Sequence, residues 1–309
     1  MPLLNRGGTG FGRAIPTQAP FGEVDTSQPA GAAMKTGLFE ACANLNCRTG
    51  WLHLWRNRAV PGFENGWTCS PACTAVRVTA AVNRELDGRG YAGESHRHRI
   101  PLGLVMLEQG WITQTQLRRA LEAQKAARTG RLGEWLVRQR AVSEATVTRA
   151  LGLQWSCPVL PLELHDAAAM TVAMPRLFVD AFGALPLRLA GGRVLYLGFE
   201  ERLDPVLARA TERMTGLQVE CGMVRESLFR PAHARILDAK FPGVELVEAV
   251  SEPAAAHALA RSVERTRPIA SRLVRVHDCL WLRMWLSPQT GPLPETGSVL
   301  DLVCSIGIP

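Results

Sequence analysis

The pattern of apolar and polar residues changes several times along the chain, and the changes divide it into five segments. Residues 1–36 are rich in Gly, Pro, Thr and Ala without periodicity, which is typical of a flexible tail. Residues 37–90 carry Cys and Trp, residues 97–165 have the three- to four-residue apolar spacing of helices, and residues 166–240 mix both kinds of pattern. Residues 241–309 read as an Arg-rich helical segment followed by a C-terminal tail. The chain is therefore expected to have an α+β fold with several small subdomains.

Turn and cap signals place the elements of the mixed α/β segment, residues 166–240. Glycine, proline and aspartate mark the ends of helices and the tight turns of hairpins. They predict, in chain order, a helix starting at Pro175, a hairpin of residues 184–189 and 193–198 across Gly191–Gly192, a helix between Asp204–Pro205 and Gly216, and a strand at residues 217–224.

The helical segment contains an internal repeat. At an offset of 30, residues 101–124 (copy 1) align with residues 131–154 (copy 2). Each copy reads as a short helix, a bend and a second helix, whose N-caps are Thr113 and Ser143. Apolar residues four apart place one stripe on each second helix, so the two copies could simply form a four-helix mini-bundle.

Four of the eight cysteines lie within 32 residues. Four residues separate Cys42 from Cys47, three separate Cys69 from Cys73, and 21 lie between the two pairs. This spacing predicts a tetrahedral four-thiolate zinc site that stabilises a small module, and four thiolates leave no open position for catalysis. Unligated buried thiols and a redox role are the alternatives, and His53 is a rival ligand.

The residues between and after the cysteine pairs suggest how this module folds. Alternation at residues 51–55 and a turn at Pro61–Gly62 predict a hairpin, and Ser70 with Pro71 predicts the start of a helix. A hairpin followed by a helix that carries the second cysteine pair resembles a treble-clef zinc finger.

The net charge of +7 is unevenly distributed. Residues 97–140 contain nine Arg or Lys and three Glu, a surplus of +6, and residues 261–283 contribute +4, so the remainder sums to about −3. A nucleic-acid partner is therefore unlikely, because the protein is not generally basic and the zinc segment has no basic run with interleaved aromatic residues. The arginines of residues 261–283 predict either an amphipathic contact with a partner or a capping helix with solvated side chains.

Neither a membrane span nor an active site stands out. The longest apolar stretch, residues 167–187, is interrupted by Arg176 and Asp180, and the N-terminus has no signal-peptide core, so we expect a cytoplasmic protein with reduced thiols. No pair of carboxylates forms a general acid/base couple, and in His277–Asp278–Cys279 adjacent side chains point in divergent directions. The sequence predicts a protein that is not an enzyme.

The repeat resembles the duplicated motif RLGxxLVxxGxxxxxxLxxxLxxQ of the N-terminal domain of type II secretion and type IV pilus assembly ATPases. The resemblance covers about residues 99–236, because the order LPLR, GGR, L, DP in the mixed segment is also typical of that family. The phosphate-binding loop of the ATPase module, Gly-x4-Gly-Lys-Ser/Thr, does not occur in the chain. The resemblance therefore implies the N-terminal domain without the motor.

In the subset called MshEN domains the paired motifs bind cyclic di-GMP, which defines candidate ligand positions here. Two positions depart from the motif: Pro101 replaces the first arginine, for which Arg97 or Arg99 could partly substitute, and Arg140 replaces the second glycine. The positions that the resemblance assigns to the nucleotide are Arg99, Leu102, Gly103, Gly110, Gln124, Arg131, Leu132, Gly133 and Gln154.

Three functions follow from these observations. The first is a regulatory protein that binds cyclic di-GMP and thereby changes its contacts with a partner. The second is an adaptor with the same fold that docks on a secretion, pilus or signalling component without nucleotide. The third, from another class, is a zinc-dependent nucleic-acid-binding protein that uses the arginines.

Overall fold

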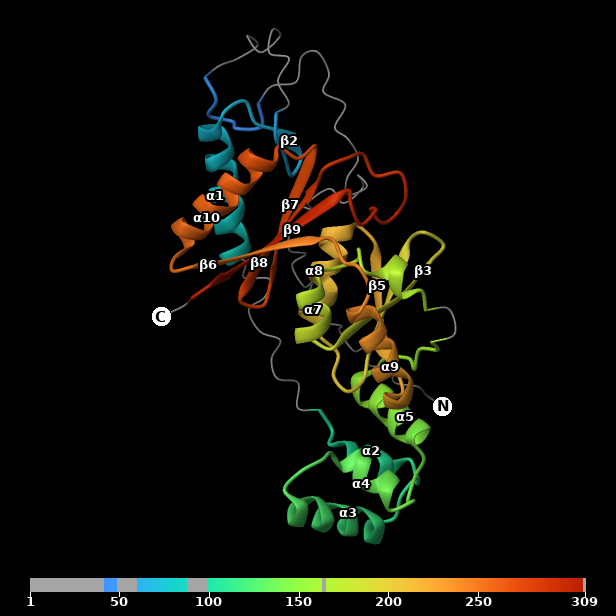
Figure 1. The fold of residues 1–309 in the computed structure, drawn as a ribbon. Helices are drawn as coiled ribbons and strands as arrows, with labels where there is room; N and C mark the ends of the chain where they lie inside the picture. The colour runs from blue at the N-terminus through green and yellow to red at the C-terminus, as the bar shows by residue number, and fades with distance from the viewer. Residues whose placement is uncertain (1–41, 49–59, 88–98, 163–164, 308–309) are drawn as a thin grey trace, which may run out of the picture.

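The computed structural model describes residues 42–48, 60–87, 99–162 and 165–307. The predicted tail of residues 1–36, the alternating residues 51–55 and the rival zinc ligand His53 lie outside these ranges. Figure 1 shows an elongated molecule with the cysteine segment and the C-terminal residues at one end, the mixed α/β segment in the middle and the duplicated helices at the other end. No helix in the described ranges is long and apolar enough to cross a membrane.

The duplicated segment forms four short helices, as its periodicity predicts. They are α2 (Leu102–Glu108), α3 (Gln114–Ala127), α4 (Leu132–Arg138) and α5 (Glu144–Trp155). Thr113 forms the predicted capping box with Gln116, and the Ser143 side chain accepts a hydrogen bond from the Thr146 amide. A small core centred on Met106 and Leu136, both fully buried, joins the two copies.

The mixed α/β segment folds around a three-stranded sheet. It comprises α6 (Ala167–Met170), α7 (Arg176–Ala181), β3 (Ala184–Ala190), β4 (Val194–Phe199), α8 (Pro205–Thr215), β5 (Gln218–Met223) and α9 (Glu226–Leu237). Strands β3 and β4 form the predicted antiparallel hairpin, and Gly191 and Gly192 supply the positive φ angles of its turn. Strand β5 pairs with β4 in parallel, and Asp204 and Gly216 cap the two ends of α8 as predicted.

The C-terminal residues differ from the expected helical segment and tail. Only α10 (Glu252–Thr266) is helical, and the other elements are the strands β6 (Gly243–Ala249), β7 (Ala270–Val276), β8 (Cys279–Trp285) and β9 (Val299–Ile306). These strands form one sheet in the order β6-β9-β8-β7. The expected helical character of the Arg-rich residues ends at Thr266, because residues 270–276 and 279–285 form an antiparallel hairpin, β7 and β8, in continuous register.

One buried ion pair explains why an arginine can lie inside this sheet. Arg283 on β8 donates from Nε and Nη2 to the two carboxylate oxygens of Asp301 on β9, each at 2.8 Å, and Trp281 Nε1 donates to the same carboxylate at 2.8 Å. Arg283 Nη1 donates to the Val172 carbonyl at 2.8 Å, which ties the sheet to the mixed α/β segment. Every polar group of the pair thus has a partner.

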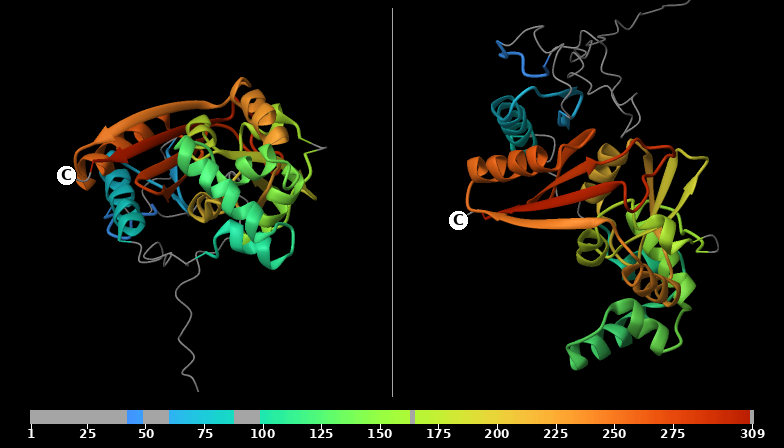
Figure 2. Two further views of the ribbon diagram at one scale, coloured as in Figure 1. Left: turned by 90° about the horizontal axis from the view of Figure 1, so that it is seen from below. Right: turned by 45° about the horizontal axis from the view of Figure 1, so that its top comes forward.

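The cysteine segment packs against the C-terminal sheet, so the two ends of the described chain share one core. Its elements are β1 (Gly62–Phe63), β2 (Gly66–Trp67) and α1 (Pro71–Leu86). Figure 2 shows α1 beside α10 on one face of the sheet, and Val78 and Val82 of α1 belong to the same buried cluster as Leu259 of α10. β1 and β2 form a hairpin whose turn is Glu64–Asn65, and the hairpin predicted from residues 51–55 stays a prediction because those residues lie outside the described ranges.

Glu85 fixes α1 to the rest of the molecule. This buried carboxylate accepts hydrogen bonds from Arg213 of α8, at 2.6 and 2.8 Å, and from the Arg275 amide of β7 at 3.2 Å. Burial raises the pKa of Glu85, but the hydrogen bonds and charge of Arg213 outweigh it and hold the pKa below its ordinary value. The cysteine segment is therefore part of a larger unit.

Candidate metal centre and duplicated-motif site

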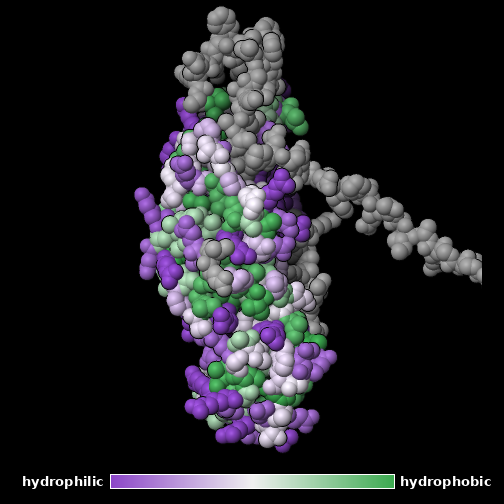
Figure 3. Space-filling view, turned by 90° about the vertical axis from the view of Figure 1, so that its right-hand side faces the viewer, coloured by the Kyte–Doolittle hydropathy of each residue, from purple (hydrophilic) through white to green (hydrophobic). Residues whose placement is uncertain are grey.

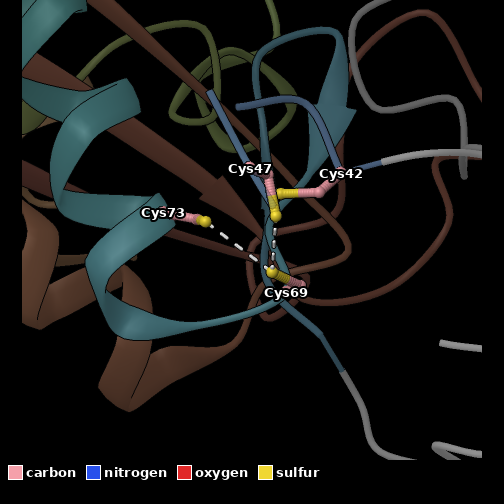
Figure 4. Close-up of side chains that lie close together, drawn as sticks. All are labelled: Cys42, Cys47, Cys69 and Cys73. Atoms are coloured by element: carbon pink, nitrogen blue, oxygen red, sulfur yellow. Dashed lines mark hydrogen bonds between the residues drawn. The ribbon is translucent and has the colours of Figure 1, made fainter. Parts of the chain in front are cut away.

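The four cysteines predicted as metal ligands lie together (Figure 4). Cys42 and Cys47 come from a turn closed by a hydrogen bond from the Cys47 amide to the Asn44 carbonyl, Cys69 follows β2, and Cys73 lies in the first turn of α1. All four Sγ atoms lie within 4.8 Å of one another, with Cys47–Cys69 at 3.5 Å and Cys69–Cys73 at 3.6 Å. Tetrahedral Zn–S bonds separate sulfurs by roughly 3.8 Å, so the cluster is compatible with one zinc ion.

The surroundings of the sulfurs also fit a metal centre. Burial raises the pKa of the Cys42 thiol to about 12, against the opposing backbone hydrogen bonds from Asn44 and Cys69. The Asn44 side-chain amide donates to Cys73 Sγ at 3.3 Å, the outer hydrogen bond that ligand sulfurs commonly receive. A divalent cation among the four sulfurs would favour the thiolates that burial disfavours.

Arg131, the arginine that copy 2 retains, is surrounded by carboxylates. Its Nε donates to Glu134 at 2.9 Å and its Nη2 to Glu200 at 3.0 Å, while Nη1 pairs with Glu201 and Nη2 lies 3.8 Å from Glu226. Burial lowers the pKa of Arg131, but the hydrogen bonds that it donates to Glu200 and Glu134 outweigh this effect and raise the pKa above its ordinary value. Its donor fork is occupied within the protein.

Sequence reasoning missed these carboxylates. Glu200 and Glu201 follow β4 and Glu226 begins α9, each at least 69 residues from Arg131. These carboxylates reach Arg131 only because the mixed α/β segment packs against the duplicated helices. The acidic pair at the end of a predicted strand was the available signal.

The two motif glutamines hold the copies together. Gln124 Nε2, at the end of copy 1, donates to the Gly130 carbonyl just before copy 2, at 2.9 Å. Gln154 Nε2 makes the equivalent bond to the Ile100 carbonyl, just before copy 1, at 2.8 Å. The two bonds are reciprocal, so each glutamine fastens the end of one copy to the start of the other.

The motif glycines and leucines lie at contacts between helices. A Cβ added to Gly103 would lie 2.7 Å from the Leu117 side chain, and one added to Gly133 would lie 2.7 Å from Val147. Leu102 and Leu132 are partly buried against the core of the four helices. The close approach that the motif glycines permit is therefore between the two helices of one copy.

The remaining candidate residues are exposed. Gly110 has a left-handed backbone (φ 68°), and Arg140 adopts the same conformation (φ 55°) at the equivalent position of copy 2. Arg99 lies with its guanidinium 3.2 Å from the centre of the Trp155 ring. Arg99 contacts Trp155, whereas Arg131 pairs with Glu200, and no ion pair among the described residues joins the two sites.

The start of α9 lies beside copy 2. Glu144, at the start of α5, accepts hydrogen bonds from the Ser227 amide at 2.6 Å and from the Ser227 hydroxyl at 2.7 Å. A cavity of about 590 Å³ lies along this contact. Its walls come from copy 2 (Gly133, Glu134, Val137, Arg138, Glu144 and Val147) and from α9 (Glu226, Ser227, Arg230 and Pro231).

At the β7–β8 turn, His277 of the His277–Asp278–Cys279 run pairs with a residue that is distant in the sequence. His277 Nε2 lies 2.7 Å from Asp204 Oδ2, so its acidic partner is the cap of α8 and not its neighbour Asp278. Of the four widely spaced cysteines, Cys304 is buried, and Cys157, Cys221 and Cys279 are partly buried.

Comparison with known proteins gives similarity only to solved structures. No family model and no curated protein matches the chain. A structure of MshE with cdg is 25% identical, with a TM-score of 0.37, over 45% of this chain and 99% of that one. Two structures of the XpsE N-terminal domain are 20% and 21% identical, with TM-scores of 0.31 and 0.26, over 43% and 42% of this chain and 92% and 90% of theirs. The chain is thus similar to MshE and to the N-terminal domain of XpsE over about 45% of its length.

Proposed function

We propose that this protein is a non-enzymatic adaptor in which copy 1 binds an amphipathic helix of a protein partner. The observation that carries the proposal is a difference between two equivalent faces. The face of copy 2 lines a cavity whose other wall is α9, whereas Leu104 of copy 1, at the position of Glu134 in copy 2, is 52% exposed.

Internal repetition makes this difference informative. Because Gly103 packs against Leu117 as Gly133 packs against Val147, we infer that copy 1 repeats the surface with which copy 2 borders the cavity beside α9. Leu121, one turn beyond Leu117 on α3, is 45% exposed and extends the apolar surface. On this surface copy 1 has Leu104 where copy 2 has Glu134. The apolar side chain favours the apolar face of a helix as the binding partner.

Basic residues beside the apolar surface of α3 indicate the charge that the partner helix would carry. Arg118 and Lys125 follow Leu117 and Leu121 along the same side of α3, at the i, i+4 and i, i+7 spacings of one helix face, and both are exposed. A partner helix with acidic residues beside its apolar face would complement them. The resemblance of the repeat to secretion and pilus ATPase domains suggests a secretion, pilus or signalling component.

Cyclic di-GMP is the competing ligand, and the surroundings of Arg131 disfavour it. A phosphate that approached Arg131 would have to displace Glu134, Glu200 and Glu226 or lie beside their charges. Like charges at this range repel by about 1 kcal/mol even in bulk water and by more at a partly buried site. Gln124 and Gln154 already donate to backbone carbonyls. We therefore favour docking of a protein partner over nucleotide binding as the function of the duplicated motif.

A paired pull-down tests the docking function. Leu104→Glu gives copy 1 the residue of copy 2, and Leu246→Glu changes a similarly exposed leucine on β6 as the control. We expect the partner recovered with the wild type to be retained by Leu246→Glu and to fall about tenfold or more with Leu104→Glu, with or without added nucleotide. Equal recovery with both variants, or recovery only when cyclic di-GMP is added, would overturn the proposal.

For the four cysteines we propose a structural zinc ion. Its role would be to fasten the turn of Cys42–Cys47 to the start of α1, in an arrangement like that of a treble-clef finger. The expected metal content of the purified protein is near one zinc per chain. A content near zero, with four thiols that react freely in the native protein, would refute the site.

A further inference from the structure

A second cavity, of about 350 Å³, lies where the three parts of the molecule meet. Arg99 and Trp155 contribute from the duplicated helices, Phe182 and Arg202 from the mixed α/β segment, and His277 from the turn between β7 and β8. The cavity lies apart from the contact between copy 2 and α9, and Arg99 is the one member of its lining among the positions that the resemblance assigns to the nucleotide.

Two guanidinium groups face this cavity without a carboxylate partner. Neither Arg99 nor Arg202 makes an ion pair with an acidic residue in the part of the chain that the structure describes, and both are exposed. Trp155 supports Arg99 through the cation–π contact at 3.2 Å and leaves the edge of the guanidinium fork open. The fork is thus positioned before any ligand arrives.

The acidic residue of the cavity is already committed. Asp204 Oδ1 accepts a hydrogen bond from the Leu207 amide at 2.9 Å, and Oδ2 lies 2.7 Å from His277 Nε2. The hydrogen bond to Asp204 raises the pKa of His277 against the opposing effects of burial and of Arg202. With Arg99 and Arg202 against the single carboxylate of Asp204, the lining carries a net charge of +1 when His277 is neutral and of +2 when it is protonated.

We propose that this cavity binds a small phosphate-bearing anion no larger than a mononucleotide. Guanidinium forks bind phosphate oxygens in pairs, and two forks at one cavity match a group with several such oxygens. The volume is at the lower end of the range of ligand sites. Phe182, whose ring centre lies 4.8 Å from that of His277, and the apolar Leu203 and Val206 supply a wall for an organic group. This site is independent of the docking function.

Calorimetric titration at low ionic strength tests the site, with inorganic pyrophosphate and guanosine monophosphate as probes. We expect pyrophosphate to bind the wild type and both Arg99→Ala and Arg202→Ala to weaken binding at least tenfold. Arg225→Ala, an exposed arginine outside the cavity, and Arg131→Ala are expected to bind as the wild type does. Tighter binding of guanosine monophosphate than of pyrophosphate would add support for the apolar wall.

Two results would overturn the proposal. One is the absence of binding of either probe by the wild type up to millimolar concentration. The other is an equal loss with Arg225→Ala and Arg202→Ala, which would show general attraction to a basic surface. Unchanged thermal unfolding of the variants confirms that a loss of binding does not reflect loss of the fold.

Discussion

The buried pair Arg283–Asp301 gives the sharpest prediction for stability, through the variant Asp301→Asn. Arg283 is 1% exposed and Asp301 is fully buried, and the carboxylate accepts three hydrogen bonds at 2.8 Å. The amide keeps the shape but removes the charge and turns a donor toward the guanidinium. Removing one partner of a buried ion pair costs about 3–5 kcal/mol, which is a large part of the stability of a typical domain.

An exposed pair of similar geometry provides the control. Arg265 lies 2.6 Å from Glu245, but the side chains are 65% and 38% exposed. We expect Arg265→Met to lower the free energy of unfolding by less than about 1 kcal/mol, because water screens this pair. Urea unfolding followed by circular dichroism measures both variants under one set of conditions.

A double variant tests the physical reason for the difference. Arg283→Met with Asp301→Leu removes both charges, so its loss of unfolding free energy should be at least about 2 kcal/mol smaller than the sum of the two single losses. Some loss remains, because the Val172 carbonyl and Trp281 Nε1 lose their partners. A loss for Asp301→Asn as small as that of Arg265→Met would refute the argument from burial.

Three further predictions concern backbone strain, pH and metal. Arg140→Gly should raise the free energy of unfolding by about 0.5–1 kcal/mol, because Arg140 holds the left-handed conformation that Gly110 holds in copy 1, and a lowered melting temperature would contradict this. His277→Asn should lower the free energy of unfolding most between about pH 4 and pH 6.5. The pKa of His277 is raised, so the stabilisation by the His277–Asp204 pair is lost as pH rises through that pKa. The pKa of Asp204 is lowered, so the same stabilisation is lost as pH falls through it. An equal loss at pH 6 and pH 9, by thermal melting, would be the contrary result. A zinc chelator should lower the melting temperature of the wild type and leave that of Cys69→Ser unchanged, and equal lowering of both would count against the metal site.

Local signals were sufficient for the elements near residues 100–224. Thr113, Ser143, Asp204 and Gly216 cap the helices that their sequence context predicts, and Gly191–Gly192 turns the predicted hairpin. These features depend on residues within one or two turns of each other. The cluster of four cysteines was equally predictable, because two close pairs with a short spacer indicate it.

The remaining features of the fold and of the site depend on contacts between residues that are far apart in the sequence. Arg283 in a strand resembles a solvated arginine until Asp301 on the neighbouring strand is known to neutralise it. The packing of α1 against α10 joins residues that are about 180 positions apart. Arg131 was predicted to face a phosphate, and Glu200 and Glu226 reach it only through the folded mixed α/β segment. Hydrophobic periodicity carries no information on such partners.

The assignment of the duplicated motif to docking is tested most directly by one titration of cyclic di-GMP into the wild type and into Arg131→Ala. Because carboxylates occupy the Arg131 fork, we predict that neither protein binds the nucleotide at micromolar affinity, so that the two isotherms are alike and flat. Binding to the wild type at micromolar or tighter affinity that Arg131→Ala abolishes would contradict the account and establish the motif as a nucleotide site.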